Sequence, residues 1–397
     1  MTNLPQGWEV KTLSEIGEIV TGSTPSKSNL DFYGKDYPFF KPSDFEQGYF
    51  LENAGDNLSK LGFGKARQLP PKTILVVCIG SLGKVALTKV IGSCNQQINA
   101  IIPHKNIISE YIYYYCISSK FQSILFSKAP QTTLAILNKT EFSKLEIIYP
   151  KDIKEQERIV GILDFAFSKI DENIKKAKEN LANIDELMQS ALQKAFNPLN
   201  DNTKENYQLP QSWEWKSLGD TSNYGKTSQV KPSQLKGNDW ILELEDIEKE
   251  SGVLLQKVLF QDRQSKSNKI KFNKGDILFG TLRPYLKKVI IADDNGACSS
   301  EIMPFSTGNS ITNHFIYYYL FANFLHDRIS SLTYGARMPR LGTKDGKSLQ
   351  IPLPPLQEQE QIAEHLDFVF EKAKALKELY TKELKDYEEL KQSLLDK

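Results

Sequence analysis

The sequence predicts an α/β (α+β) fold of two tandem mixed α/β lobes separated by two long antiparallel helices, which form a coiled coil with pseudo-twofold symmetry. Two observations carry this prediction. A heptad pattern runs without interruption after residue 155, and a second copy of it begins 203 residues later. Before each helix, short apolar runs alternate with amphipathic segments, as is typical of mixed α/β domains.

The first long helix is predicted from apolar residues at alternating gaps of four and three, the spacing of a coiled-coil seam. No Pro or Gly interrupts the pattern after Gly161, and Asn197-Pro198 ends it. At 1.5 Å per residue, a helix of roughly 42 residues is about 60 Å long. The seam consists of Leu163, Phe167, Ile170, Ile174, Ala177, Leu181, Ile184, Met188, Ala191 and Ala195.

The second long helix belongs to an internal repeat. Residues 155–160 return with two changes as residues 358–363, and Leu-Asp follows both copies, at Leu163 and Leu366. Elsewhere the offset stays between 202 and 205 residues, so the halves are nearly collinear and indicate a duplication. Other repeated segments are 4–13 and 209–218, Lys84-Val85 and Lys288-Val289, Cys94 and Cys298, and Tyr113–Tyr115 and Tyr317–Tyr319.

Each lobe contains strand and helix signals. Residues 72–79 and their counterpart 274–280 are apolar runs bounded by Pro or Gly, which indicates buried strands. Residues 109–125 and 313–329 are amphipathic and predict one helix in each lobe. The tyrosine triplets lie within these helices. At helical spacing they are more typical of a core and a helix surface than of a platform that stacks on bases.

These signals divide the chain into five parts. Lobe one covers residues 1–153 and the first spacer helix 154–197; after a linker at 198–206, lobe two covers 207–356 and the second spacer helix 357–397. Antiparallel pairing would place the lobes at opposite ends of the helices. That symmetry suits two different half-sites on a DNA duplex, with the helices fixing the gap between them.

Composition excludes several classes of protein. No window approaches the roughly 18 apolar residues of a membrane span, and the first residues lack the plan of a signal peptide. The four cysteines form no Cys-x-x-Cys motif, so we expect a cytoplasmic chain with reduced thiols. Lobe one has 16 Lys and Arg against 13 Asp and Glu, and lobe two 19 against 15, whereas acidic residues prevail in both helices. A nucleic acid is therefore a partner for the lobes rather than for the helices.

No catalytic motif emerges. Residues 342–348 resemble a phosphate-binding loop, but one residue is missing between the glycines. The tetrapeptides of amino-methylating enzymes are absent. The four histidines are scattered without metal-ligand spacing. The sequence therefore predicts a chain without a catalytic residue, a bound cofactor or a metal of its own.

The candidate DNA-binding residues lie in basic and polar loops of the lobes. Arg pairs with guanine and Gln with adenine in the major groove, so Arg337 and Gln131 are the foremost candidates. Lysines in these loops would neutralise phosphates, although a solvated surface loop explains such a run equally well. The full set is Lys60, Lys65, Arg67, Ser81, Lys84, Gln131, Thr132 and Thr133 in lobe one, and Lys266, Lys269, Lys271, Arg283, Tyr285, Lys287, Tyr334, Arg337 and Arg340 in lobe two.

The chain resembles the specificity (S) subunit of type I restriction-modification systems. The resemblance rests on Leu-Pro-x-x-Trp at the start of each half, the turn at 21–26, the Gly-Ala-Arg-x-Pro loop at 335–339, and Pro354-Pro355-Leu356-Gln357-Glu358-Gln359 at the start of a long helix. It covers essentially all 397 residues. Lobe one departs from the pattern before its helix and at 129–133.

The resemblance implies a non-catalytic subunit of a bacterial defence complex. Each lobe would be a target recognition domain that reads one half of an asymmetric bipartite site in double-stranded DNA. The helices would dock two copies of an adenine N6-methyltransferase subunit, and an ATP-dependent restriction and translocase subunit would join them. S-adenosylmethionine, ATP and Mg would then bind to these partners. The alternatives are a coiled-coil adaptor that binds proteins only, and a detached piece of a fused restriction-methylation enzyme.

Overall fold

The computed structural model describes residues 4–129, 135–199, 208–263 and 265–396. Its contacts divide the chain into two compact units. The first unit comprises residues 1–177 and 382–397, and the second residues 178–381. Each unit therefore contains one lobe, one part of the first spacer helix and one part of the second. No helix in the described parts is long and apolar enough to cross a membrane.

Lobe one is built on a mixed five-stranded sheet and a three-stranded sheet. In the large sheet β6 lies in the middle, and its four residues are fully buried because both faces are covered. Helix α3 (Ser109–Ile117) packs on β6 and β7. The strand order is β2 (Gly17–Thr21), β9 (Ile98–Pro103), β6 (Ile74–Val77), β7 (Val85–Thr88), β4 (Phe50–Leu51) in one sheet and β5 (Asp56–Leu58), β3 (Tyr33–Phe40), β8 (Ser93–Cys94) in the other.

Lobe two repeats much of this plan with a different division of the strands. Strand β17, which ends at Cys298, pairs parallel with β13, as β8, which ends at Cys94, pairs parallel with β3. The predicted equivalence of the two cysteines is thus confirmed. The sheets are β12 (Gln229–Val230), β14 (Lys269–Phe272), β17 (Gly296–Cys298), β13 (Trp240–Leu242); β16 (Val289–Ile291), β15 (Ile277–Gly280), β18 (Ile302–Phe305); and the hairpin β19 (Thr333–Tyr334), β20 (Arg340–Leu341).

A two-stranded ribbon connects the start of each lobe to its end. The first strand pairs antiparallel with the last, which brings the entry of the lobe next to its spacer helix. These ribbons are β1 (Trp8–Thr12) with β10 (Glu146–Pro150) and β11 (Glu214–Ser217) with β21 (Gln350–Leu353). The short helices are α1 (Leu13–Ile16), α2 (Lys60–Lys65) and α5 (Lys139–Ser143) in lobe one, and α7 (Leu218–Thr221), α8 (Phe260–Arg263) and α11 (Thr343–Ser348) in lobe two. The 3-10 turns are η1 (Leu30–Phe32), η2 (Pro42–Gln47), η3 (Pro232–Gln234), η4 (Leu244–Asp246) and η5 (Pro284–Leu286).

The prediction of a single amphipathic helix in each lobe is wrong, because each of these segments forms two helices. Ser118 ends α3 (Ser109–Ile117) with extended backbone, and its hydroxyl caps α4 (Ser119–Lys128) by accepting from Phe121 N. In lobe two α9 (Asn313–Tyr319) and α10 (Asn323–Leu332) are separated by residues 320–322. The expectation that the tyrosine triplets belong to the core is confirmed by the buried Tyr114 and Tyr318.

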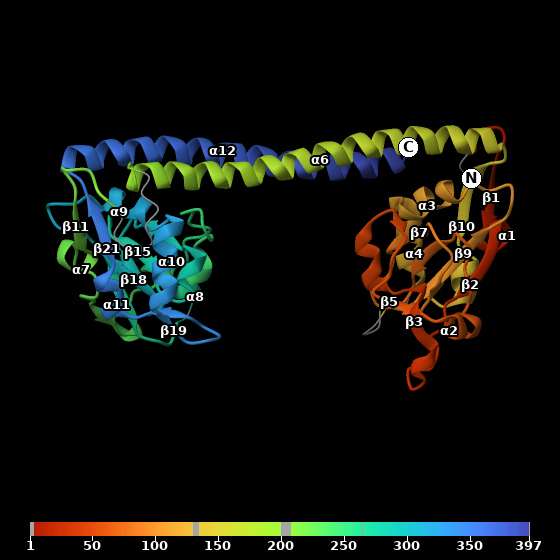
Figure 1. Cartoon of the computed structure of the whole chain (residues 1–397), viewed down its shortest axis with the longest axis horizontal. Helices are drawn as coiled ribbons and strands as arrows, with labels where there is room; N and C mark the ends of the chain where they lie inside the picture. Colours follow the sequence, from red (N-terminus) through yellow and green to blue (C-terminus); the bar gives the residue numbers. More distant parts are fainter. Residues whose placement is uncertain (1–3, 130–134, 200–207, 264, 397) are drawn as a thin grey trace. The chain divides into compact units, whose positions relative to one another are not determined.

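The two long helices are α6 (Ile153–Phe196) and α12 (Leu356–Leu395), which Figure 1 shows in yellow-green and blue. In the second unit Lys377 forms an ion pair with Asp185, and Ala373 packs with Ile184 and Met188. In the first unit Lys391 forms an ion pair with Asp171. Higher numbers on α12 meet lower numbers on α6 in both units, so the segments run antiparallel in each.

Each unit also takes the end of one long helix into its lobe. Leu192 and Phe196 of α6 are fully buried in the core of lobe two, where the Phe196 ring lies 5.1 Å from that of Phe315. Leu394 and Leu395 of α12 pack against the core of lobe one. Burying such a side chain contributes about 1.5–3 kcal/mol, so the helix ends are parts of the lobes.

Candidate nucleic-acid interface

One glutamine joins each lobe to the start of its own helix, and we call this joint the glutamine clasp. Gln359 of α12 is fully buried, accepts from Thr312 N at 3.0 Å, and donates to Ser310 O at 3.0 Å and Pro354 O at 2.8 Å. Its bonds go to backbone on both sides of the joint. The side chain therefore fixes the angle at which the helix leaves the lobe.

Lobe one has the same clasp. Gln156 of α6 is fully buried, accepts from Ile108 N at 2.9 Å, and donates to Pro150 O at 2.9 Å and Asn106 O at 3.4 Å. The repeated hexapeptide therefore has a structural cause, because its glutamine makes the same bonds in both halves.

The repeated Leu-Asp pair makes a second joint. Tyr114 OH donates to Asp164 Oδ1 at 2.5 Å, and Tyr318 OH donates to Asp367 in the same way. Burial raises the pKa of both phenols, and the carboxylates that accept from them add to this effect. The phenols consequently remain donors throughout the neutral range, and both helices are held at two points.

Lobe two presents two neighbouring loops that, together with the strand ends beside them, carry most of its predicted DNA-binding residues. The loop at 282–287 contains η5, and we call it the η5 loop. The hairpin loop at 335–339 joins β19 to β20. The two loops are connected by Arg283 N, which donates to Pro339 O at 2.7 Å. The fold thus brings together Arg283, Tyr334, Arg337 and Arg340, and Tyr285 lies in the same η5 loop.

These side chains are available to a ligand. Arg283 and Arg337 are exposed, and Tyr285 and Tyr334 are 49% and 60% exposed. Within the described residues, neither arginine forms an ion pair. Met338, at 55% exposure, adds an apolar group beside Arg337. An unpaired guanidinium next to exposed aromatic rings can pair with a guanine edge and pack against the DNA backbone.

Two other predicted DNA-binding residues of lobe two are buried inside the lobe. Lys269 is 2% exposed and donates to Glu243 Oε1 at 2.7 Å. Lys287 is 6% exposed and donates to Phe321 O at 3.0 Å, and burial lowers its pKa. Their ammonium groups already have partners, so neither placement suits a phosphate contact. Lys266 and Lys271 are exposed.

The predicted residues of lobe one are more dispersed. Lys60 and Lys65 are exposed on α2, and Arg67 follows them, with its backbone N bonded to Ser23 Oγ at 3.2 Å. Ser81 is exposed in the turn after β6. Lys84 forms an ion pair with Glu46, which weakens its case as a phosphate ligand. Gln131, Thr132 and Thr133 lie outside the described residues.

Sequence reasoning missed a polar loop in lobe one at residues 95–97, which we call the amide loop. Its three residues, Asn-Gln-Gln, lie between β8 and β9. Thr24 Oγ1 donates to Gln96 Oε1 at 2.5 Å, and Ser23 N donates to Cys94 O at 3.0 Å. The turn at 21–26 is therefore packed on the amide loop, with Arg67 beside it. Three consecutive amide residues were the available signal, because amides can read adenine. Asn95 is buried and its side chain donates to Gln97 Oε1 at 2.8 Å, so Gln96 is the exposed member of the loop.

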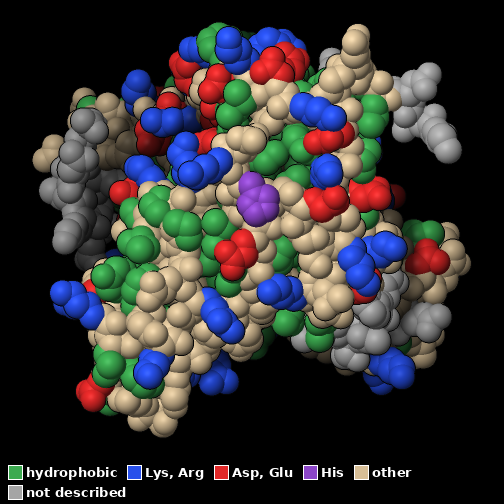
Figure 2. Space-filling view, turned by 90° about the vertical axis from the view of Figure 1, so that its right-hand side faces the viewer, with side chains coloured by type: hydrophobic (Ala, Val, Ile, Leu, Met, Phe, Trp, Pro, Cys, Tyr) green, Lys and Arg blue, Asp and Glu red, His purple; other side chains and the backbone are tan. Residues whose placement is uncertain are grey.

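The equivalent edges of both lobes thus carry the candidate residues. The turn after β6 corresponds to the η5 loop after β15, and the amide loop corresponds to residues 299–301 before β18. On the face of the first unit seen in Figure 2, Lys and Arg side chains are interspersed with Asp and Glu. The candidate interface is defined by the loops named above.

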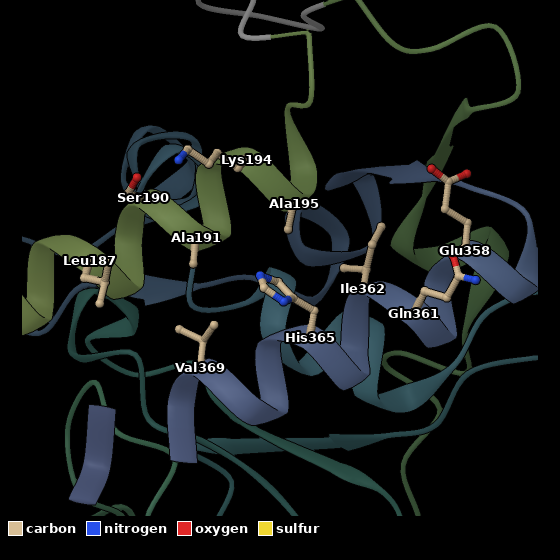
Figure 3. Close-up of a pocket in the computed structure, with 10 residues that line it drawn as sticks. All are labelled: Leu187, Ser190, Ala191, Lys194, Ala195, Glu358, Gln361, Ile362, His365 and Val369. Carbon is tan, nitrogen blue, oxygen red and sulfur yellow. The ribbon is translucent and has the colours of Figure 1, made fainter. Parts of the chain in front are cut away.

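A groove between the two long helices is the second candidate surface. In the second unit it has a volume of about 530 Å³, and His365 and Ile362 of α12 lie across it from Ala191 and Ala195 of α6 (Figure 3). In the first unit a groove of about 650 Å³ lies beside the same helix turn, but residues of lobe one form most of its lining. Glu155, Arg158, Ile159 and Ile162 line it, and Glu358, Gln361, Ile362 and His365 occupy the repeat-equivalent positions in the second unit.

No residue set among the described parts of the chain could hold a metal ion. The four cysteines are buried and free, and burial raises their pKa. Apolar burial makes a thiol inert rather than nucleophilic.

Comparison with known proteins agrees with this geometry. The model of the type I restriction modification DNA specificity domain matches residues 5–183 and 210–385. The HindI specificity subunit of Haemophilus influenzae is 39% identical over 43% of this chain and 38% of its own length. The MjaIX specificity subunit of Methanocaldococcus jannaschii is 29% identical over 55% of this chain and 52% of its own. These matches thus span about half or less of those relatives.

The relatives that match nearly the whole chain have a lower sequence identity to it. The EcoDI specificity subunit of Escherichia coli is 22% identical over 99% of this chain and 88% of its own length. A chain from a structural study of complex assembly and conformational transition of the type I restriction-modification system has a TM-score of 0.78, at 19% identity over 100% of this chain and 98% of its own. The HsdS subunit from Thermoanaerobacter tengcongensis, at 19% identity over 99% and 96%, has a TM-score of 0.55. Because the family model covers both lobes, the chain belongs to the type I restriction-modification DNA specificity family.

Proposed function

We propose that this chain is the DNA specificity subunit of a type I restriction-modification complex and is itself non-catalytic. Each lobe reads one half of an asymmetric bipartite site in double-stranded DNA. One observation carries the proposal. The two lobes place loops of different composition on equivalent edges, with arginine and tyrosine in lobe two and amides in lobe one. Equivalent edges that carry unlike side chains suit two different half-sites.

The helices serve as the docking surface for two copies of an adenine N6-methyltransferase subunit. The support is a groove in each unit beside the first turns of the long helix, where repeat-equivalent residues contribute to the lining. Two similar grooves suit two copies of one partner. An ATP-dependent restriction and translocase subunit joins this complex, and S-adenosylmethionine, ATP and Mg bind to the partners. A cytoplasmic location stays a prediction.

The alternative hypothesis of a coiled-coil adaptor that binds proteins only is not supported. It explained the helices and left the loops of the lobes without a role. The family model covers both lobes as DNA specificity domains, so the lobes carry the function.

The test is a methylation map. The full-length chain is co-expressed with its methyltransferase, and N6-methyladenine is located on the host DNA by single-molecule sequencing. We expect one bipartite, asymmetric motif. Exchange of residues 207–356 for those of a relative should change one half of this motif and leave the other half unchanged. Absence of any motif, together with no co-purified methyltransferase, would overturn the proposal.

A further inference from the structure

The turn at residues 320–323, between α9 and α10, is bound by two distant parts of the second unit. Gln189 of α6 donates to Phe321 O at 3.3 Å and accepts from Asn323 N at 3.1 Å. Lys287 of the η5 loop donates to the same Phe321 O at 3.0 Å and to the Asn323 side chain. The spacer helix and the η5 loop therefore share one hydrogen-bonded turn.

The η5 loop has a strained backbone. Arg283 and Lys287 have φ values of +50° and +46°, and the described chain has only two other non-glycine residues with positive φ. Such conformations are strained for residues other than glycine and persist where the surroundings enforce them. Arg283 at the start of the loop is exposed, whereas Lys287 at its end is 6% exposed. The buried end therefore holds the exposed end in place.

We propose that Gln189 and Lys287 are positioning residues that connect α6 to the η5 loop. Gln189 fixes the turn at 320–323, the turn holds Lys287, and Lys287 holds the loop that presents Arg283 and Tyr285. The spacer helix thereby helps to set the base discrimination of lobe two, in addition to the spacing of the half-sites. This inference rests on the proposed function.

In lobe one, different contacts hold the turn after β6, which is the equivalent of the η5 loop. Gln122 donates to Gly83 O at 2.9 Å and Cys116 O at 2.6 Å, so one residue of α4 ties the loop to its own turn. Asp396, the residue after α12, accepts from Ser119 N at 3.0 Å. Gln392, the repeat equivalent of Gln189, has a buried Nε2 without a hydrogen-bond partner. Gln392→Ala is therefore a matched control that removes a glutamine from the same place in the repeat.

The experiment compares Gln189→Ala, Lys287→Met and Gln392→Ala in the full-length chain, each co-expressed with the methyltransferase. Methylation is measured at matched sites and at sites with one mismatch in either half, and the exchange of residues 207–356 shows which half belongs to lobe two. One mismatch costs about 1–3 kcal/mol in protein–DNA recognition. We expect the matched-to-mismatched ratio for the lobe-two half to fall about tenfold in the first two variants. The lobe-one half and Gln392→Ala should keep the wild-type ratio.

A purely structural role gives a different result. It would lower methylation at all sites together and leave both ratios unchanged, and that outcome would overturn the inference. Lys287→Arg keeps the donors and should restore most of the ratio, which provides a folded comparison if Lys287→Met accumulates poorly. A wild-type chain that yields no bipartite motif would overturn the proposed function as well. A wild-type motif with unchanged ratios in the variants would overturn this inference alone.

Discussion

Replacement of Gln359 by Ala tests whether the glutamine clasp holds lobe two to its helix. The change removes three hydrogen bonds, of 2.8 to 3.0 Å, from a side chain that is fully buried. Each bond contributes about 0.5–1.5 kcal/mol net, and a buried group left without a partner costs about 1–3 kcal/mol. We therefore expect the free energy of unfolding of the second unit to fall by about 3–5 kcal/mol.

Tryptophan fluorescence during urea denaturation measures this loss. Trp213, Trp215 and Trp240 lie in the second unit, and Trp8 lies in the first, so the signal reports mainly on the unit that the substitution affects. Gln357→Ala is the control, because Gln357 is exposed in the first turn of the same helix, where substitutions change stability by about 0.5 kcal/mol or less. If the two variants differ by less than about 1 kcal/mol, the clasp does not hold the joint.

Three other substitutions test other parts of the structure. Burial lowers the pKa of His326 to about 4 from 6.5. Between these two pH values the unfolded chain binds more protons than the folded chain, so the free energy of unfolding decreases as the pH is lowered. The second unit should lose about 2 kcal/mol between pH 7 and 5, and His326→Gln, which copies Gln122 of lobe one, should abolish this loss; an unchanged slope in urea titrations would contradict the assignment. A Cβ on Gly22 would lie 2.1 Å from Asn95 O, whereas one on Gly64 would meet nothing within 4 Å. Gly22→Ala should therefore destabilise the first unit by about 1–3 kcal/mol and disturb the amide loop, and a melting temperature equal to that of Gly64→Ala would argue against the close packing. Lys269→Met leaves Glu243 without its buried partner and should cost about 3–5 kcal/mol, whereas Lys271→Ala should spare stability and lower the salt dependence of DNA binding by about one phosphate contact. Equal stability of these two variants would show that the Lys269 ion pair has no structural role.

The sequence predicts the long helices and the repeat well because both are periodic. The heptad positions Leu163, Ile170, Ala177, Ile184 and Met188 are buried as expected. The strands predicted around residues 72–79 and 274–280 are β6 and β15. Periodicity could not reveal the break at Ser118, because its hydroxyl caps a new helix while the apolar spacing continues.

The candidate site was harder to predict than the fold. Lys269 and Lys287 stand in runs of basic residues that look like exposed loops, but their partners are far away in the chain. Glu243 precedes Lys269 by 26 residues, and Phe321 follows Lys287 by 34. Arg283 and Arg337 are exposed, and their segments are joined by backbone bonds such as Arg283 N to Pro339 O and Leu341 N to Thr281 O. Contacts of this kind leave no local pattern.

The glutamine clasp also bears on how this chain can diverge. Both Gln156 and Gln359 bind backbone N–H and C=O groups of their lobe and of the segment that leads into the helix. Every residue type offers the same C=O group, and every residue except proline the same N–H. The joint therefore places little demand on the side chains of the lobe that it holds. Mutation and recombination can rewrite a lobe while its attachment to the helix stays intact, so new target sequences can arise without a redesign of the frame.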